Sequence, residues 1–547
     1  MSPPLGRPTP LLPGSMAIAG SLTIGRMKSS LRSAVSGLVD WLLAEKPDRA
    51  VFVLAIAGAV ATAAVCVPRG YERNGIQVPA AAAWGIMALG VAIAVLAALR
   101  AWPGLLAWIV AMPFFTAARI GPVVGWVQLT STTVILATLA FSIVLGFRRT
   151  RPNTPAVPLA LAGAMAALAV LATAISPDLS TGVSITLHGI IEPVVVGVLV
   201  VLVRPTLRQL VALAGAMAAS VVIAGAVNLV RIVLVVHHLG DFQALRNEFG
   251  RITFYNVGLF GAMLVTVLPL MAIVIVRPAL IAGALERAAV ALGRASSPVR
   301  PGNRAEAALR LAGAVIFGFL LLEVALTFSK SAWIACAVVG LGLALALPGT
   351  WRRRGIGLGR IAVVAVFFVV ISLVTAAKTS DRNNSFDPNS AEGEASITAR
   401  FQATKAAIHI AIDHPILGVG PGLFGYQYAG HYRSADVTDL LQSAHDMIPN
   451  IAAEYGVPLA LIFSLTVLAA LLAALRTWRS GAGLARLLAL TYGLALVAFM
   501  TVATLFGTDL YRTYRYMNTD VVFLGLLLGA IAVLWSRATD VDEGAAA

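Results

Sequence analysis

The sequence predicts an all-α, polytopic membrane protein with one large extracytoplasmic loop that contains short helices. Composition, the length of the apolar runs and the placement of arginine carry this prediction. Of the 547 residues, 59% are hydrophobic and 12% are charged, and the mean hydropathy is +0.88. Soluble domains are roughly 45–50% apolar and about 25% charged. Soluble, disordered and disulfide-rich classes are therefore excluded.

Fourteen apolar runs approach the length of about 20 residues that a helix needs to cross a bilayer. They lie at residues 50–68, 79–99, 102–118, 124–147, 156–175, 183–203, 209–236, 256–276, 311–328, 332–349, 361–377, 457–475, 485–506 and 520–535. Only a short hinge, Arg100–Pro103, separates the second run from the third. The predicted number of transmembrane helices is about fourteen, within a range of twelve to fourteen.

Arginine in the short loops predicts the orientation of these spans, because cytoplasmic loops are enriched in Lys and Arg. One side carries Arg148, Arg149, Arg151, Arg204, Arg208, Arg277, Arg287, Arg294, Arg300, Arg304, Arg310, Arg352, Arg353, Arg354, Arg360, Arg476, Arg479, Arg486 and Arg537. Fourteen spans place all of them in the cytoplasm, together with both termini. Topology thus explains most of the net charge of +15. The expected partner is the lipid bilayer, and no nucleic-acid partner is predicted.

Five parts follow from this topology. They are a cytoplasmic N-terminal segment (1–48), transmembrane helices 1–11 (49–377), an extracytoplasmic catalytic loop (378–456), transmembrane helices 12–14 (457–536) and a cytoplasmic tail (537–547). A surface helix is expected around 27–45. In the loop, Ile397–Ile412 has helical periodicity, with Phe401, Ile408 and Ile412 on one face. That pattern predicts a helix lying on the membrane surface.

Basic residues on the predicted outer side need a reason other than topology. They are Arg69, Arg73, Arg119, Arg246, Arg251, Lys330, Lys378, Arg382, Arg400, Lys405, Arg433, Arg512 and Arg515. An anionic ligand such as a phosphate or pyrophosphate is one reason, since arginine offers it a planar fork of donors. Contact with lipid headgroups or local ion pairing is the other.

Two segments of the outer loop favour a reaction site for such an anion. Glycines at 418, 420 and 422 allow backbone N–H groups to approach a phosphate, although any tight loop also needs glycine. His445 precedes a helix that Pro449 helps to begin, and a helix N-terminus favours anions. A neutral histidine there can act as a general base, whereas the alternative is an ordinary loop residue.

Four ionisable residues fall inside the predicted spans: His188, Glu192, Arg231 and Glu323. Such groups are costly in hydrocarbon and usually face the bundle interior or a cavity. A structural pair of Arg231 with Glu192 or Glu323 and a role in substrate binding both remain open.

Four stretches, in order, resemble the O-antigen ligase and O-antigen polymerase family of bacterial glycan-assembly proteins. They are Arg251–Asn256, Leu326–Trp333, Arg400 with His414–Gly422, and His445 with Glu454–Val457, in which ten residues separate the histidine from Gly456. Two departures stand out. Lys330 occupies a position where arginine is usual, and Asp446 follows the histidine where asparagine or serine is common.

This resemblance implies a GT-C-like, inverting glycosyltransferase in the inner membrane that acts on the extracytoplasmic face. Its donor would be a glycan linked to polyprenyl (pyro)phosphate, and its acceptor an envelope glycan, lipoglycan or protein. His445 would be the general base, and Arg400, Lys330 and Arg251 would bind the donor phosphate. Further candidates for this anion are Arg119, Arg231, Arg512, Arg515, Gly418 and Gly420. No metal or other cofactor is expected.

Other readings remain open. Family members of both kinds share these motifs, so the sequence does not separate a ligase from a polymerase. A transporter or flippase for lipid-linked sugars would suit the intramembrane Arg231, Glu192 and Glu323. A transferase that uses a polyprenyl monophosphate sugar commonly has a catalytic acid in the first outer loop, where this chain has Glu72.

Overall fold

A computed structural model of the chain describes fourteen stretches, whose regular structure is helical apart from four strands of two residues each. The described residues are 49–66, 72–73, 76–77, 80–116, 123–124, 127–128, 131–150, 156–235, 257–279, 303–327, 329–346, 391–433, 443–504 and 519–546. The chain divides into two compact units, Met1–Asp48 with Pro278–Leu309, and Arg49–Arg277 with Arg310–Ala547. Within the first unit, only residues 278, 279 and 303–309 are described. The contacts below lie within the second.

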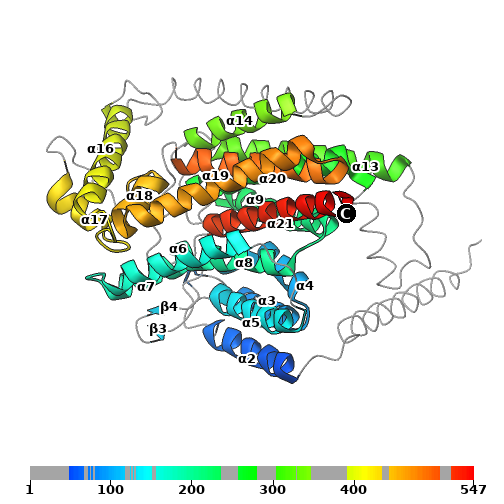
Figure 1. Ribbon diagram of the computed structural model, residues 1–547, viewed down its shortest axis with the longest axis horizontal. Coiled ribbons are helices and arrows are strands. Elements are labelled where there is room, and N and C mark those ends of the chain that lie inside the picture. The colour runs from blue at the N-terminus through cyan, green and yellow to red at the C-terminus, as the bar shows by residue number, and fades with distance from the viewer. Residues whose placement is uncertain are drawn as a thin grey trace, which may run out of the picture. The chain divides into compact units, whose positions relative to one another are not determined.

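The bounds of the elements are as follows (Figure 1). The helices are α2 (Arg49–Cys66), α3 (Ala80–Leu99), α4 (Ala101–Thr116), α5 (Ser131–Thr150), α6 (Ala156–Ala174), α7 (Leu179–Thr186), the π-helix η1 (Leu187–Ile191), α8 (Glu192–Val203), α9 (Leu207–Val235), α11 (Val257–Val276), α13 (Asn303–Leu326), α14 (Lys330–Ala346), α16 (Ala391–Asp413), α17 (Phe424–Gln427), the π-helix η2 (Tyr428–Tyr432), α18 (Met447–Tyr455), α19 (Val457–Ser480), α20 (Gly483–Thr504) and α21 (Thr519–Ala546). Strands β1 (Glu72–Arg73) and β2 (Ile76–Gln77) form one antiparallel hairpin, and β3 (Val123–Val124) and β4 (Val127–Gln128) form another.

Seven helices of the described part are long and apolar enough to cross a membrane. They cover Ala156–Ala174, Leu179–Val203, Leu207–Val230, Leu259–Val276, Glu306–Leu326, Val457–Ser480 and Gly483–Thr504. Six shorter apolar helices accompany them. Among the fourteen predicted runs, 361–377 lies outside the described residues, and helices coincide with the others. The molecule is thus a helical, polytopic membrane protein.

Small residues let the apolar helices approach one another closely. A Cβ at Gly197 of α8 would lie 3.0 Å from the carbonyl oxygen of Gly525 in α21. A Cβ at Gly525 would collide with the carbonyl oxygen of Pro193. Lipid tails are as apolar as leucine, so helices in a membrane associate through this kind of close backbone packing.

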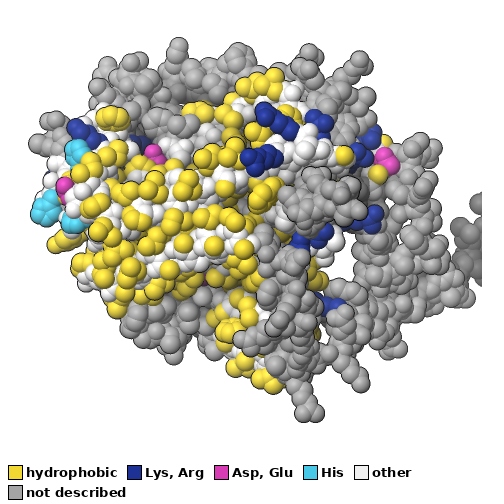
Figure 2. All heavy atoms as spheres, viewed as in Figure 1, with side chains coloured by type: hydrophobic (Ala, Val, Ile, Leu, Met, Phe, Trp, Pro, Cys, Tyr) yellow, Lys and Arg dark blue, Asp and Glu magenta, His cyan; other side chains and the backbone are white. Residues whose placement is uncertain are grey.

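Basic side chains of the described part gather at helix ends that lie together. Arg204 caps α8 in a left-handed conformation, with φ of 47°. Arg537 of α21 donates to the carbonyl oxygens of Arg204, at 2.7 Å, and Pro205, at 3.0 Å. In Figure 2, Lys and Arg gather mainly at one end of a broad hydrophobic surface, and His lies at the other end.

Two of the four ionisable residues inside the predicted spans, His188 and Glu192, lie in contact with each other. His188 lies in η1, and its Nδ1 is 3.1 Å from Oε1 of Glu192, one turn later. The same carboxylate oxygen accepts a hydrogen bond of 2.7 Å from the hydroxyl of Thr133 in α5. Glu323 of α13 is fully buried beside Gly225 of α9. The side chain of Arg231 lies outside the described residues.

Candidate active site

Helix α16 presents two chemically different faces. Alanines and Ile410 pack inward against the following loop and α18: Ala399, Ala403, Ala406, Ala407 and Ile410 are buried. On the opposite face, Phe401 is 70% exposed, Ile408 49% and Ile412 67%. The helix therefore includes the predicted segment 397–412, with the predicted apolar face turned away from the protein. It crosses one end of the long helices at a steep angle (Figure 1).

Helix α18 explains the spacing between His445 and Gly456. Its nine residues run from Met447 to Tyr455. Asp446 is the N-cap residue, with an extended backbone, and its carboxylate accepts a hydrogen bond of 3.3 Å from the amide of Ile448. Gly456 is the C-cap, with φ of 91°. The motif of a histidine, ten residues and a glycine is thus one short helix with its two caps.

His445 has a strained backbone and a buried side chain. Its φ of 54° is left-handed, which is uncommon outside glycine and costs of order 1–3 kcal/mol. The residue is 9% exposed. Such strain persists only where the surroundings fix the conformation, and strained residues cluster at functional sites.

The residue before the histidine is held from two sides. The amide of Ala444 donates to Oδ1 of Asn450 in α18 at 2.9 Å. The carbonyl oxygen of Ala444 accepts a hydrogen bond of 3.0 Å from the hydroxyl of Thr404 in α16. Arg400, which is half-buried, lies one helical turn before Thr404 on the same side of α16. The structure therefore brings the segment of α16 that carries Arg400 against the segment that carries His445.

The glycine turn wraps around the end of α18. The amide of Val419 donates to the carbonyl oxygen of Ala453 at 2.9 Å, and that of Gly420 donates to Glu454 at 3.0 Å. The amide of Gly418 donates to the carbonyl oxygen of His414 at 3.1 Å. Both glycine amides that were candidates for phosphate binding are thus engaged within the protein. Their hydrogen bonds support a structural role, in which the turn satisfies the last carbonyl groups of a helix.

Glu454 lies buried beneath this turn. Its Oε1 accepts a hydrogen bond of 3.3 Å from the amide of Phe424. Burial raises the pKa of this carboxyl to about 7, against the opposing effect of hydrogen bonds from the amides of Gly422 and Phe424. Asp446, at the other end of α18, is partly buried, and burial raises its pKa to about 6. Both ends of the short helix therefore hold carboxyl groups that titrate near neutrality.

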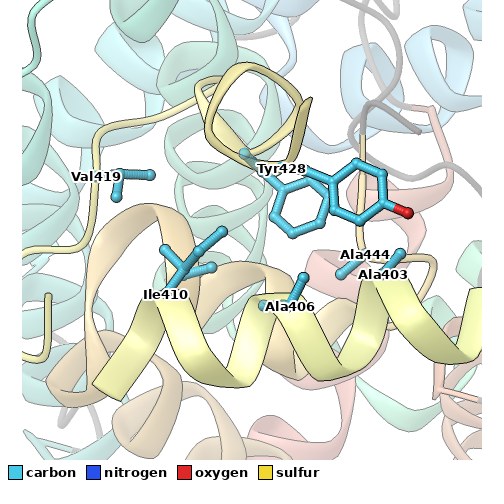
Figure 3. Packing of buried hydrophobic residues seen from close by; sticks show 9 residues of the cluster. Ala403, Ala406, Ile410, Val419, Tyr428 and Ala444 are labelled. Atoms are coloured by element: carbon cyan, nitrogen blue, oxygen red, sulfur yellow. The ribbon is translucent and has the colours of Figure 1, made fainter. Parts of the chain in front are cut away.

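A small hydrophobic cluster unites α16, the glycine turn and α18. It comprises Ala403, Ala406, Ala407, Ile410, Val419, Phe424, Tyr428, Ala444 and Ala453. The rings of Phe424 and Tyr428 stack with centroids 5.7 Å apart. Figure 3 shows the Tyr428 ring extending above α16 toward Ala403 and Ala444. The loop thus has a core of its own, which supports the peptide group before His445.

Hydrogen bonds and close packing attach this core to the transmembrane helices. The hydroxyl of Tyr455 lies 3.2 Å from that of Thr186 in α7, which in turn lies 2.6 Å from that of Thr173 in α6. Gly422 packs so closely on Ile185 that a Cβ there would collide with its side chain. The site is therefore positioned by α6 and α7 as well as by the loop.

Lys330 begins α14 at a tight corner after α13. The indole nitrogen of Trp333 donates to the carbonyl oxygen of Val324 at 3.1 Å. The hydroxyl of Ser329 accepts a hydrogen bond of 3.4 Å from the amide of Ala332. The structure describes the backbone of Lys330, and its side chain lies outside the described residues, as does that of Arg231. Arg119, Arg251, Arg512 and Arg515 lie wholly outside them.

Residues 315–464 match the O-antigen ligase family. Over this stretch the chain is similar to that family. The matched domain extends from α13 to the first turns of α19 and contains Lys330, Arg400 and His445. At the level of the family, the match supports glycan transfer of the O-antigen ligase kind. A comparison with curated proteins gave no match.

The sequence did not predict a role for two residues of this site, Asn450 and Thr404. Asn450 stands four positions after Asp446, and its side chain fixes the amide before His445. The hydroxyl of Thr404 forms the hydrogen bond between α16 and the same peptide unit. For Thr404, the signal is a polar residue beside the alanines that form the inward face of α16.

Proposed function

We propose that the protein is a glycosyltransferase that moves a glycan from polyprenyl (pyro)phosphate to an envelope acceptor on the extracytoplasmic face of the inner membrane. The observation that carries the proposal is the meeting of α16 and α18 at Ala444, inside the matched domain. That contact sets a candidate base and a candidate phosphate ligand on adjoining elements.

In this proposal, His445 removes the proton from the acceptor hydroxyl. The acceptor oxygen forms a new bond to the anomeric carbon from the face opposite the phosphate, so the configuration inverts. The bond between that carbon and the carrier phosphate breaks, and its electron pair leaves with the phosphate. Arg400, with Lys330 and Arg251, stabilises the charge that develops on this leaving group. A pyrophosphate leaves readily, so the scheme needs no metal.

The arrangement of basic side chains supports the orientation. Arg204, Arg476 and Arg486 lie at or near helix ends, and Arg537 of α21 donates to the carbonyl oxygen of Arg204. The sequence assigns all four to the cytoplasm. The α16–α18 segment precedes the opposite end of α19. A reaction at His445 would therefore take place on the outer face.

The test uses a deletion strain complemented with wild type or with variants at position 445. His445→Ala removes the base, and His445→Asn removes it while keeping a residue that tolerates a left-handed backbone. His431→Ala is the matched control, because His431 is an exposed histidine of the same loop. The carrier-linked glycan and the glycan on its final acceptor are measured in each strain.

Each outcome has a defined meaning. Full-length glycan on the carrier with a bare acceptor identifies a ligase, and accumulation of single repeats with loss of long chains identifies a polymerase. Both require that His431→Ala behaves as wild type. If the variants at 445 match wild type in both pools, the base is not His445, and transport of lipid-linked sugars becomes the better explanation.

A further inference from the structure

Three buried hydroxyl groups form a chain from the candidate active site into the transmembrane helices. The phenol of Tyr455, the last residue of α18, lies 3.2 Å from the hydroxyl of Thr186. That hydroxyl lies 2.6 Å from the hydroxyl of Thr173, which donates to the carbonyl oxygen of Ala169 at 2.7 Å. The three residues that carry these hydroxyls are between 0% and 5% exposed, so bulk water does not compete for the hydrogen bonds.

The chain has a direction, because each hydroxyl carries a single hydrogen. Thr173 uses its hydrogen on Ala169 of its own helix, so it can only accept from Thr186. Thr186 is then committed to Thr173 and can only accept from Tyr455. The phenol of Tyr455 is therefore the donor at the start of the chain, and a backbone carbonyl of α6 is the final acceptor.

The chain ends where several transmembrane elements meet. Thr186 ends α7 and precedes η1, and Thr173 lies in the last turn of α6. His188 of η1 contacts Glu192, whose carboxylate accepts a hydrogen bond from Thr133 of α5. The segment that begins at Thr186 is thereby tied to two neighbouring helices. Its hydroxyl provides a fixed point for the loop.

The orientation of α18 depends on side contacts, because Gly456 separates this helix from α19. Gly456 has φ of 91°, so α18 does not continue the axis of α19. Asn450 and Glu454 form hydrogen bonds with the loop on one side of α18. Tyr455 projects about 140° away from Asn450 around the helix axis and bonds to the spans. Hydrogen bonds thus hold α18 from two sides.

A small rotation of α18 displaces the candidate base by a distance that affects catalysis. Ten residues separate His445 from Gly456, which corresponds to about 15 Å along a helix. A rotation of about 4° at Gly456 therefore moves His445 by about 1 Å. A misplacement of about 1 Å can cost about a hundredfold in rate. The hydroxyl of Tyr455 lies off the helix axis, so its bond to Thr186 resists such a rotation.

We propose that Tyr455 is a positioning residue for the reaction at His445. It acts through its hydrogen bond to Thr186, which fixes the orientation of α18 relative to the transmembrane helices. Tyr455 is fully buried, so its effect on the reaction passes through α18. The inference rests on the proposed function, because the geometry that Tyr455 fixes is that of the proposed base.

The experiment measures transfer by purified full-length variants in proteoliposomes, with carrier-linked glycan and acceptor extracted from the deletion strain. Tyr455→Phe removes the first hydroxyl and keeps the ring. Thr186→Val replaces the second hydroxyl with a methyl group, and Thr186→Ser keeps it. Thr266→Val is the matched control, because Thr266 of α11 is a buried threonine whose hydroxyl bonds within its own helix, to the carbonyl oxygen of Ala262 at 2.7 Å.

The direction of the chain predicts the order of the effects. Tyr455→Phe is expected to lower kcat about tenfold, because the remaining contacts of α18 limit the displacement, and to change the KM for the donor less than about twofold. Thr186→Val should lower kcat further, because it takes the acceptor from the buried hydroxyl of Tyr455. The double variant should match Tyr455→Phe, since that hydroxyl is then absent. Thr186→Ser and Thr266→Val should transfer as wild type does.

Two kinetic outcomes would overturn the inference. One is wild-type kcat in Tyr455→Phe. The other is a loss in the double variant equal to the product of the two single losses, because residues of one chain do not act independently.

A second measurement reports the position of α18 independently of transfer. Leu171 is exposed on α6, and Ile448 is partly exposed on α18. Spin labels at these two positions, with Cys66 and Cys336 replaced, should give a broader distance distribution in Tyr455→Phe than in wild type. An unchanged distribution also contradicts the inference. If wild type transfers no glycan while the distribution still broadens in the variant, the proposed function fails and the anchoring of α18 stands.

Discussion

At the scale of single residues, the position of His445 depends on how its neighbouring peptide is held. Asn450 is 2% exposed and accepts the hydrogen bond from the amide of Ala444. In Asn450→Ala this buried amide loses its acceptor, at a cost of about 1–3 kcal/mol. The left-handed backbone of His445 then relaxes. We expect glycan transfer to fall at least tenfold, with kcat reduced more than the KM for the lipid-linked donor is raised.

Asn450→Asp provides the comparison, because it keeps an acceptor oxygen on the same side chain. It is expected to retain more transfer than Asn450→Ala at equal amounts of membrane-inserted protein. Equal activity of the two variants would show that the acceptor oxygen has no positioning role.

The buried carboxyl of Glu454 predicts a pH dependence of stability. Its pKa in the folded protein is raised to about 7, whereas an unfolded glutamate titrates near 4.3. The folded state therefore holds the proton more tightly. This contribution is fully present below about pH 4.3 and is lost as pH rises through 7, with an upper bound on the order of 4 kcal/mol. Glu454→Gln should flatten the fall in unfolding temperature across this window.

Titration of Asp446 changes stability in the same direction between about pH 4 and 6. Because wild type and Glu454→Gln both contain Asp446, the difference between their pH profiles reports on Glu454 alone. Identical pH profiles for wild type and Glu454→Gln would refute the assignment.

At the scale of elements, the C-cap of α18 depends on glycine. Gly456 has φ of 91°, and a Cβ there would collide with the carbonyl oxygen of Ile416. Gly456→Ala is therefore expected to destabilise the loop by more than about 2 kcal/mol, since strain and a steric clash act together. Gly430→Ala is the control, because open space surrounds that position. Limited proteolysis should cleave the loop of the Gly456 variant faster than that of wild type, and the control should resist as wild type does.

The outward face of α16 predicts contact with the bilayer. Phe401, Ile408 and Ile412 are exposed along one stripe, and exposed Lys405 and His409 lie beside it. A spin label at position 412 should be more accessible to oxygen than to a water-soluble nickel chelate. A label at position 409 should show the reverse. The labels require replacement of both native cysteines, Cys66 and Cys336. If the labels at positions 409 and 412 were both more accessible to the nickel chelate than to oxygen, this face of α16 would lie in water.

How much of this site was predictable differs between elements. Apolar run length located the helices because hydrocarbon admits few other backbone structures. The periodicity of 397–412 located the exposed stripe of α16 for a similar local reason. The partners of the glycine turn were not predictable, since Val419 and Gly420 bond to Ala453 and Glu454, far along the chain. The pairing of His188 with Glu192 was missed even though the two residues are one turn apart.

At the scale of the whole molecule, basic helix ends and the candidate site should lie on opposite faces of the membrane. Ser480 is exposed at the end of α19, beside Arg479, and His431 is exposed in η2. Cysteines placed at these two positions, with Cys66 and Cys336 replaced, report the two sides. A membrane-impermeant maleimide should label His431→Cys in intact spheroplasts and Ser480→Cys only in inside-out vesicles. The reverse pattern would invert the topology and move His445 to the cytoplasmic face, where the proposed transfer to an envelope acceptor is impossible.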